Sequence, residues 1–191
     1  MIITRHDSGY FKVQSGSTTI LIDPTNQRSF RGARIVINTE RPTKVESPKD
    51  DDTLFWIDHQ GEYEIDGIVV RGWYAEKGAE GERTVYTIVF EGIRIGIIGP
   101  VTKLKPEFVE HLRAVDVVMV PVGGKPLLSP KDIAGFVRQI EPAIIIASRY
   151  KDAKPFLKEF GEDTCKEEEK IVIKKKDVEQ GTMKLMCLKV T

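Results

Sequence analysis

Two almost entirely apolar runs, separated by one helix-sized segment, constrain the fold of this chain most strongly. The runs are Val115–Val120 and Ala143–Ala147, and such runs are typical of strands that are covered on both faces. Between them, Ser129-Pro-Lys-Asp132 predicts a helix start, with serine as the N-cap and proline in the first turn. Apolar residues then follow at the helical spacing i, i+3, i+4 and i+7: Ile133, Phe136, Val137 and Ile140. The pattern predicts a strand–helix–strand unit.

The N-terminal half consists of short β-rich runs joined by turn residues. Asp66-Gly67 and Glu91-Gly92 predict tight hairpin turns, so we expect a meander of antiparallel strands. The segment Thr43–Thr53, with its charged run Lys49-Asp-Asp-Asp52, is expected to be a surface loop. The expected strands are Ile2–Thr4, Tyr10–Val13, Thr19–Asp23, Ile35–Asn38, Leu54–Asp58, Gly61–Ile65, Ile68–Tyr74, Thr84–Glu91 and Ile93–Ile98.

The C-terminal part adds two shorter helices and a last pair of strands. We expect the helices at Pro106–Arg113 and Lys154–Phe160, followed by a solvated loop over Glu162–Lys170. The strands Ile171–Lys175 and Met183–Val190 are expected to form an antiparallel pair around a turn at Gly181. Residues 1–191 therefore predict a single α/β domain with two mixed sheets.

Charge and composition argue against two classes of partner. Lys and Arg number 29 and Asp and Glu number 29, so the net charge is zero and no long-range field attracts nucleic acid. No apolar run approaches the roughly 20 residues of a membrane helix. Met1–Asp7 lacks the features of a secretory signal, which predicts a cytoplasmic protein. Homodimerisation through an exposed strand edge remains open.

The cysteines and histidines give no spacing typical of a metal or redox motif. Cys165 and Cys187 are expected to be reduced thiols, with a disulfide between them as the less favoured alternative. His111 lies on the charged face of a predicted helix, His59 at a strand end, and His6 beside an aspartate in a turn. Metal sites need several converging ligands, and these three histidines are scattered.

Several phrases, in their order along the chain, resemble the metallo-β-lactamase superfamily. The resemblance is to the branch of small metal-dependent hydrolases related to ascorbate-6-phosphate lactonase. It implies a four-layer αββα sandwich of two mixed β-sheets. The matching phrases are Thr19-Ile-Leu-Ile-Asp-Pro24, Ile35-Val-Ile-Asn-Thr-Glu40, Gly61-Glu-Tyr-Glu-Ile-Asp-Gly67, Gly92-Ile-Arg-Ile-Gly-Ile-Ile-Gly99 and Val115-Asp-Val-Val-Met-Val-Pro-Val-Gly-Gly124.

The metal ligands that the resemblance implies are absent from the matching positions. Ser8 stands where the family has a histidine after the first strand. Pro100 replaces a bridging aspartate, and Arg149 replaces the last histidine. The positions of the family's H-x-H-x-D-H motif are held by Thr39, Arg41, Thr43 and Lys44. Cations at these positions oppose a divalent metal ion, and loss of the metal removes the activated hydroxide that the family's chemistry needs.

The favoured hypothesis is a degenerate member of this fold that has lost its metal site and needs no cofactor. It would act as a non-catalytic binding or scaffold module. Its cationic residues would pair with Asp23, Glu40 and Asp58 and fill the old cleft, or, less favoured, bind a small anionic ligand. The remnant cleft would comprise Ser8, Asp23, Thr39, Glu40, Arg41, Lys44, His59, Pro100 and Arg149.

The alternative hypothesis is a metal-dependent hydrolase that acts on an ester, lactone or phosphodiester through a non-standard site. That site would use zinc or manganese. Its ligands would come from His6, Asp7, Asp23, Asp58 and His59, because strand-end residues of this kind gather in the clefts of such folds.

Overall fold

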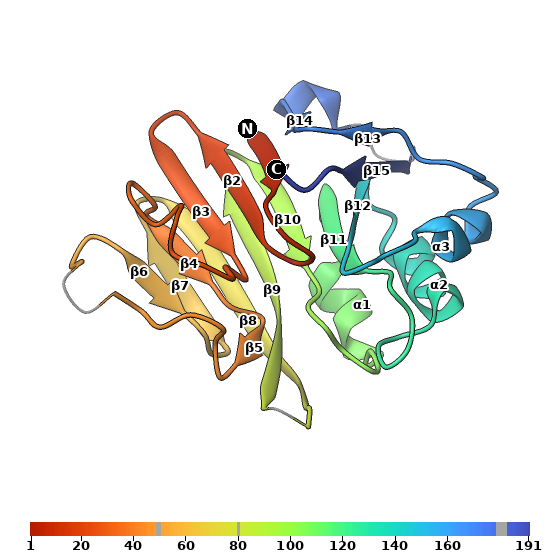
Figure 1. Ribbon diagram of the computed structural model, residues 1–191, viewed down its shortest axis with the longest axis horizontal. Coiled ribbons are helices and arrows are strands. Elements are labelled where there is room, and N and C mark those ends of the chain that lie inside the picture. The colour runs from red at the N-terminus through yellow and green to blue at the C-terminus, as the bar shows by residue number, and fades with distance from the viewer. Residues whose placement is uncertain (49–50, 80, 179–182) are drawn as a thin grey trace.

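Two mixed β-sheets stacked face to face form the centre of the molecule, as the resemblance implies (Figure 1). The computed structural model describes residues 1–48, 51–79, 81–178 and 183–191. The six-stranded sheet has the order β14 (Ile171–Val172), β1 (Ile2–Arg5), β2 (Phe11–Ser15), β3 (Thr18–Ile22), β4 (Ile35–Ile37) and β6 (Phe55–Ile57).

The second sheet has nine strands. Along its main path lie β13 (Glu167–Glu168), β15 (Lys184–Leu188), β12 (Ile144–Ser148), β11 (Val117–Pro121), β10 (Ile93–Ile97), β9 (Glu82–Phe90), β8 (Ile68–Lys77) and β7 (Gly61–Ile65). The short strand β5 (Glu40–Arg41), which the sequence did not predict, pairs with β9. Alternate residues of both sheets meet in one buried apolar core, for example Ile22 and Ile37 with Ile88 and Ile95.

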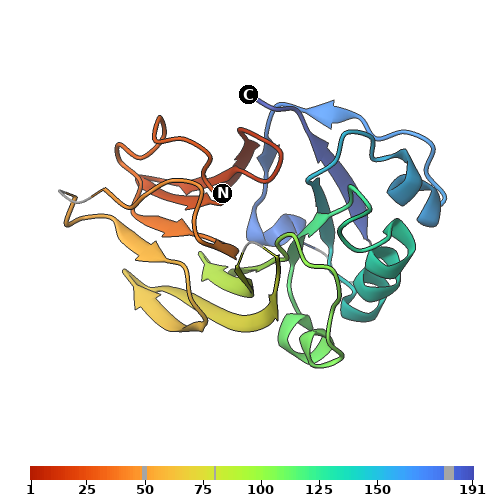
Figure 2. The ribbon, with the colours of Figure 1, turned by 60° about the horizontal axis from the view of Figure 1, so that its bottom comes forward.

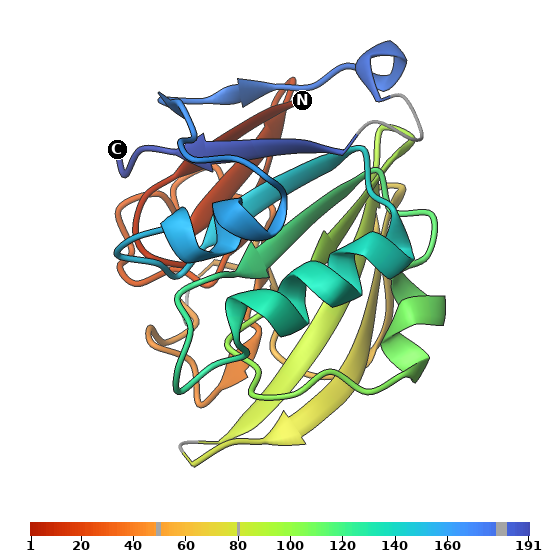
Figure 3. The ribbon, with the colours of Figure 1, turned by 90° about the vertical axis from the view of Figure 1, so that its right-hand side faces the viewer.

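The three α-helices of the described residues lie on the outer face of the nine-stranded sheet (Figures 2 and 3). They are α1 (Glu107–Leu112), α2 (Pro130–Ile140) and α3 (Lys154–Glu159). The expected N-cap of α2 is confirmed, because the Ser129 hydroxyl accepts a hydrogen bond from the Asp132 N–H at 3.2 Å. Over the six-stranded sheet, the buried apolar side chains come partly from connecting segments, as with Phe30 and Ala33. None of the described helices is long and apolar enough to cross a membrane.

The predicted antiparallel meander is confirmed in the nine-stranded sheet, but the prediction is wrong for part of the six-stranded sheet. Strands β7 to β10 are antiparallel neighbours, and Asp66 and Glu91 adopt the left-handed backbone that their two-residue turns require. In contrast, β3, β4 and β6 pair in parallel. The connections between these three strands are long enough to cross over, so they need not form hairpins. In Thr43–Thr53 the described residues form no strand, and Lys49 and Asp50 lie outside them.

The expected antiparallel pair at the C-terminus is also wrong. Strand β14 joins β1 in the six-stranded sheet, whereas β15 pairs in parallel with β12 in the other sheet. The predicted loop before β14 contains β13, and a 3₁₀ turn spans Lys175–Asp177. The predicted turn at Gly181 lies outside the described residues. Strand partners far apart in sequence are chosen by packing, which a local pattern does not encode.

The expectation of reduced cysteines is wrong, and His111 is only partly exposed. Cys165 and Cys187 form a disulfide, because the register of β13 on β15 places Glu167 opposite Cys187 and brings the two cysteines together. His111 is partly covered, because its ring stacks on Trp73 with the ring centroids 4.4 Å apart. Both contacts join residues from different elements.

Candidate functional site

The ends of four strands bring the candidate residues together. Asp23 follows β3, Thr39 lies just beyond β4, and Arg149 follows β12. The Arg149 N–H donates to the Ser8 carbonyl at 2.7 Å, which fixes the loop after β1 against the loop after β12. Asp23 and Arg149 have φ angles of 47° and 54°. Such angles are uncommon for residues other than glycine, and they cluster at sites where the surroundings enforce them.

The carboxylate of Asp23 is held by three donors. Its Oδ1 accepts the Thr39 N–H at 2.6 Å, and its Oδ2 accepts the Thr39 hydroxyl and an Arg149 guanidinium N–H, each at 2.6 Å. Thr39 has no solvent exposure, and the side chains of Asp23 and Arg149 are each 11% exposed. The partly buried carboxylate is therefore fully engaged by protein groups.

Further charged residues extend this contact into what we call the ion network: Asp23, Arg149, Glu40, Arg83 and Glu76. Arg149 lies 3.6 Å from Glu40, which lies 3.8 Å from Arg83. Arg83 then contacts Glu76 at 2.6 Å, and Glu76 also accepts the N–H and hydroxyl of Thr102 at 2.8 and 2.7 Å. Negative and positive groups alternate along the chain of contacts, so each charge has an opposite neighbour.

Little space remains between these side chains. The cavity beside Asp23, Glu40, Lys44 and Arg149 measures about 10 Å³, and a neighbouring one lined by Arg41 and Arg83 measures about 60 Å³. One water molecule needs about 10–15 Å³ on this measure. The first cavity therefore holds about one water at most, and the second only a few.

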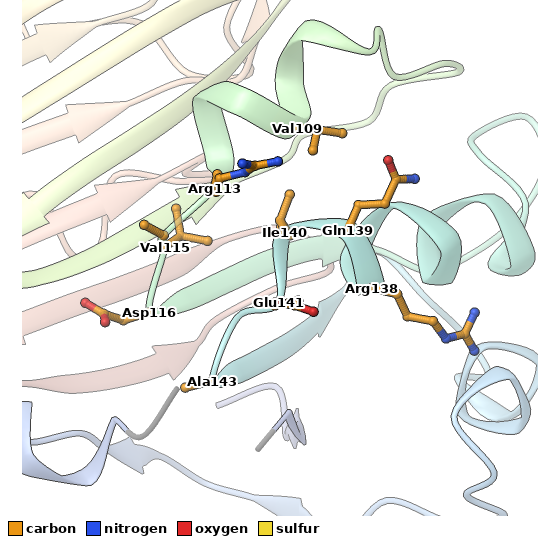
Figure 4. Close-up of a pocket in the computed structure, with 10 residues that line it drawn as sticks. Val109, Arg113, Val115, Asp116, Arg138, Gln139, Ile140, Glu141 and Ala143 are labelled. Atoms are coloured by element: carbon orange, nitrogen blue, oxygen red, sulfur yellow. The ribbon is translucent and has the colours of Figure 1, made fainter. Parts of the chain in front are cut away.

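A cavity of about 610 Å³ lies at the opposite end of the strands (Figure 4). It opens beside Asp116 and Ala143, which precede β11 and β12, whereas Arg149 follows β12. Arg113 and Glu141 border it from the ends of α1 and α2. The larger cavity thus shares no residue with the ion network.

Two glycines allow the ion network to pack closely. A Cβ atom on Gly99 would lie 2.2 Å from the Thr39 hydroxyl oxygen, and one on Gly9 would lie 2.7 Å from the Arg149 Cζ. Atoms cannot approach this closely without displacement. Glycine at these two positions therefore allows Thr39 and Arg149 to reach Asp23.

The structure brings together part of the predicted remnant cleft. Asp23, Thr39, Glu40 and Arg149 are in direct contact, and Lys44 lines the same small cavity. Ser8 contributes its backbone carbonyl rather than its side chain, and Pro100 follows the glycine that packs on Thr39. Arg41 and His59 contact each other, and His59 also contacts Asp58, beside the network rather than in it.

The five residues of the alternative hydrolase site do not gather into one cluster. The His6 imidazole contacts the Thr191 carbonyl at 3.2 Å, and Asp7 accepts from the Ser8 N–H and the Thr25 hydroxyl. Among the residues that the structure describes, no group of three or more His, Cys, Asp or Glu side chains could hold a metal ion. The carboxylates of Asp23 and Glu40 face a guanidinium, which does not fit a divalent metal.

Sequence analysis missed Glu76, Arg83 and Thr102. The available signal in the sequence was a glutamate in a strand. In the structure, Ala75 and Glu76 are consecutive and both buried, at a register shift between Tyr74 and Glu76. A bulge turns two consecutive side chains away from strict alternation. A buried glutamate needs a partner, and Arg83 and Thr102 provide it.

The two glutamates of the ion network differ in their pKa. Burial raises the pKa of Glu40 above its ordinary value of 4.5, although nearby Arg149 opposes the shift. Burial also acts to raise the pKa of Glu76, but hydrogen bonds from Thr102 and Arg83 outweigh it and hold that pKa below 4.5. Ionised Glu40 therefore weakens the fold above pH 4.5, whereas ionised Glu76 stabilises it.

We expect glutamine substitutions to separate these effects. Glu40→Gln should raise the free energy of unfolding at pH 7 by about 0.5 kcal/mol, because it removes a charge that burial disfavours. Glu76→Gln should lower it by about 2 kcal/mol, because it weakens charged hydrogen bonds. Denaturant unfolding between pH 3 and 8 would measure both.

The pH dependence supplies the control. Because the pKa of Glu40 is raised in the folded protein, its ionisation lowers the free energy of unfolding fully only above that folded pKa. The extra stability of Glu40→Gln should therefore vanish as the pH falls through the folded pKa towards 4.5. Because the pKa of Glu76 is lowered in the folded protein, its ionised form stabilises the fold fully above pH 4.5. The loss of stability in Glu76→Gln should therefore become smaller only below that pH. Equal effects of the two variants at pH 7 would contradict this assignment.

Comparison with known proteins places this chain in a family. The model of the β-lactamase superfamily domain matches residues 3–148, most of the chain, so the chain belongs to that family. Among curated protein sequences, none matches the chain significantly.

Solved structures share the fold at low sequence identity. A Thermotoga maritima protein assigned as a zinc-dependent hydrolase of the metallo-β-lactamase superfamily has a TM-score of 0.77 at 21% identity, covering 98% of this chain and 99% of that one. The metallo-β-lactamase fold protein YhfI from Bacillus subtilis has a TM-score of 0.69 at 8% identity, covering 98% and 95%. A Parabacteroides distasonis protein assigned as a metal-dependent hydrolase has a TM-score of 0.66 at 19% identity, covering 84% and 90%. At these identities the likeness shows the fold alone.

Proposed function

We propose that this chain is a non-catalytic binding or scaffold module in which the ion network takes the place of a metal centre. The observation that carries the proposal is the position of Arg149. Its guanidinium lies 2.6 Å from Asp23 and 3.6 Å from Glu40, the two carboxylates of the predicted remnant cleft. A positive side chain between them satisfies the charge that a metal would otherwise balance.

The chemistry of the guanidinium supports a loss of catalysis. A guanidinium stays protonated, carries five donors and no acceptor, and so cannot coordinate water as a metal does. Hydrolysis by a metal centre depends on a bound water that becomes hydroxide near neutral pH. The ion network holds its charges by mutual pairing and contains no group with that effect.

Ion pairing also accounts for the cations better than an anionic ligand does. Arg149 and Arg83 each already contact two carboxylates. The cavities beside them, about 10 and 60 Å³, leave little room for a ligand. An anion would have to displace Asp23 or Glu40 from a guanidinium, which leaves a partly buried carboxylate without its partner.

Metal analysis of the purified protein tests the proposal. The protein would be produced without a chelating tag, with zinc, manganese and iron supplied, and measured by mass spectrometry of the elements. We expect well below one metal ion per chain, because Arg149 opposes a divalent cation at the two carboxylates. When zinc is titrated into the protein in a calorimeter, we expect no binding heat that depends on Asp23. The parent protein and Asp23→Asn should therefore give the same heats.

The contrary outcome would favour the alternative function, a metal-dependent hydrolase of an ester, lactone or phosphodiester. The Thermotoga maritima protein is assigned as a zinc-dependent hydrolase and the Parabacteroides distasonis protein as a metal-dependent hydrolase. Near-stoichiometric metal that survives dialysis and is lost in Asp23→Asn would replace our proposal. Hydrolysis of these substrate classes would then be assayed with the metal-loaded protein.

A further inference from the structure

The disulfide joins two segments at the edge of the nine-stranded sheet. Cys165 comes just before β13, and Cys187 lies within β15. The two strands pair in parallel, with Glu167 opposite Cys187. The Cα atoms of the cysteines are 6.0 Å apart, within the range of about 4.4–6.8 Å seen in native disulfides. The backbone therefore accommodates the bond.

Residues 166–178, which follow Cys165 and which we call the strap, bridge the two sheets (Figure 1). It begins at β13 in the nine-stranded sheet and crosses to β14, which pairs with β1 in the six-stranded sheet. Strands β13 and β14 have only two residues each. So few backbone pairs hold these strands weakly, and the disulfide closes the loop that contains them.

One cysteine of the pair is partly exposed. Cys187 is 2% exposed, whereas Cys165 is partly exposed. Both line a cavity of about 240 Å³, together with Tyr150, Lys151, Asp152, Ala153, Lys154, Leu157, Asp163, Thr164 and Glu167. Thiol–disulfide exchange requires access for the attacking thiolate. A low-molecular-weight thiol can therefore approach the Sγ atom of Cys165 through this cavity.

We propose that Cys165–Cys187 is a reversible thiol–disulfide exchange site, at which low-molecular-weight thiols release or fasten the strap. A thiolate forms a bond to Sγ of Cys165 and breaks the disulfide, so Cys187 leaves as a thiolate and takes a proton. A second thiol then attacks the mixed disulfide, frees the Cys165 thiol and leaves as a small-molecule disulfide. The reverse reaction, with that disulfide as oxidant, restores the bond.

Reduction loosens the strap more than the sheets. Strand β15 keeps its own pairing with β12 over Ile144–Ile146, and the Leu188 carbonyl still accepts from the buried Arg5 guanidinium at 3.2 Å. Strands β13 and β14 keep their short ladders, and the buried side chain of Ile171 holds β14 in the core between the sheets. Because the closed loop restricts the open states of the strap, breaking it favours local opening there.

Alkylation and hydrogen exchange test the proposal on the full-length protein. The protein, purified without reductant, is alkylated under native conditions before and after treatment with reduced glutathione, and its mass is measured. We expect no alkylated cysteine before treatment and two afterwards. Amides in residues 165–178 should exchange about tenfold faster after reduction, while peptides from β7 and β8 serve as the internal control.

Variants and contrary outcomes complete the test. Cys165→Ser and Cys187→Ser should each show fast exchange in the strap, with or without glutathione. Two alkylated cysteines in the untreated native protein would overturn the proposal, since no disulfide would exist. A disulfide that glutathione opens only after denaturation, or equal exchange in the oxidised and reduced protein, would overturn it as well. None of these results depends on the metal content of the protein.

Discussion

Replacing Arg149 by alanine is expected to lower the free energy of unfolding by about 3 kcal/mol. The variant removes the guanidinium that contacts Asp23 at 2.6 Å and Glu40 at 3.6 Å. Both carboxylates are partly buried, with side chains 11% and 24% exposed. They would face each other without a cation between them, and removal of one partner from such a pair leaves an uncompensated charge.

Denaturant unfolding of matched variants measures this effect. Arg113→Ala is the control, because the Arg113 side chain is 64% exposed and, among the described residues, pairs only with Glu110 at the surface. Its loss should cost less than about 0.5 kcal/mol. Adding Asp23→Asn to Arg149→Ala should recover part of the stability, because it removes one of the two carboxylate charges that Arg149 no longer balances. A loss for Arg149→Ala no greater than that for Arg113→Ala would refute a stabilising role for the ion network.

Gly99→Ala is expected to have the second-largest effect, a loss of about 2–3 kcal/mol. The new methyl group would lie 2.2 Å from the Thr39 hydroxyl oxygen. Thr39 is fully buried, and both its N–H and its hydroxyl donate to Asp23 at 2.6 Å. Any shift of Thr39 that relieves the overlap therefore weakens two hydrogen bonds to a carboxylate as well as the packing.

Gly135→Ala is the matched control for this substitution. Gly135 lies in the middle of α2, and a Cβ atom there meets no heavy atom within 4 Å. Alanine in a helix interior is favoured over glycine by about 0.5–1 kcal/mol, so this variant should be more stable than the natural protein. Thermal unfolding of both variants would give shifts of opposite sign. A Gly99→Ala variant as stable as the parent would show that Thr39 is free to move.

Together these predictions separate the fold of this chain from the chemistry of its relatives. Residues 3–148, which include most strands of the two sheets, match the β-lactamase superfamily domain. The same fold can carry many functions, because function resides in the groups placed at strand ends. Here those groups are carboxylates, arginines and a threonine that bond to one another, which is the basis of the proposed non-catalytic role.

Local patterns predicted those parts of the fold that depend on neighbouring residues. The N-cap of α2 at Ser129, the strands β11 and β12 around it and the turns at Asp66 and Glu91 all follow from residues within a few positions of each other. The partners of β14 and β15 did not follow in this way. Either strand could pair with its sequence neighbour or with a distant one, and packing selected the distant partner.

The sequence by itself determined the class of fold and grouped the residues of the predicted remnant cleft, because matching phrases and ligand positions are properties of the chain order. Only the tertiary structure decided what these residues do to one another. Arg149 bonds to Asp23 across 126 positions, Glu76 and Arg83 join them from another hairpin, and Cys165 meets Cys187 at a strand edge. Hydrogen bonds, ion pairs and disulfides require contact within a few ångströms. Contacts between distant residues form when packing brings their strands together, and spacing along the chain does not encode them.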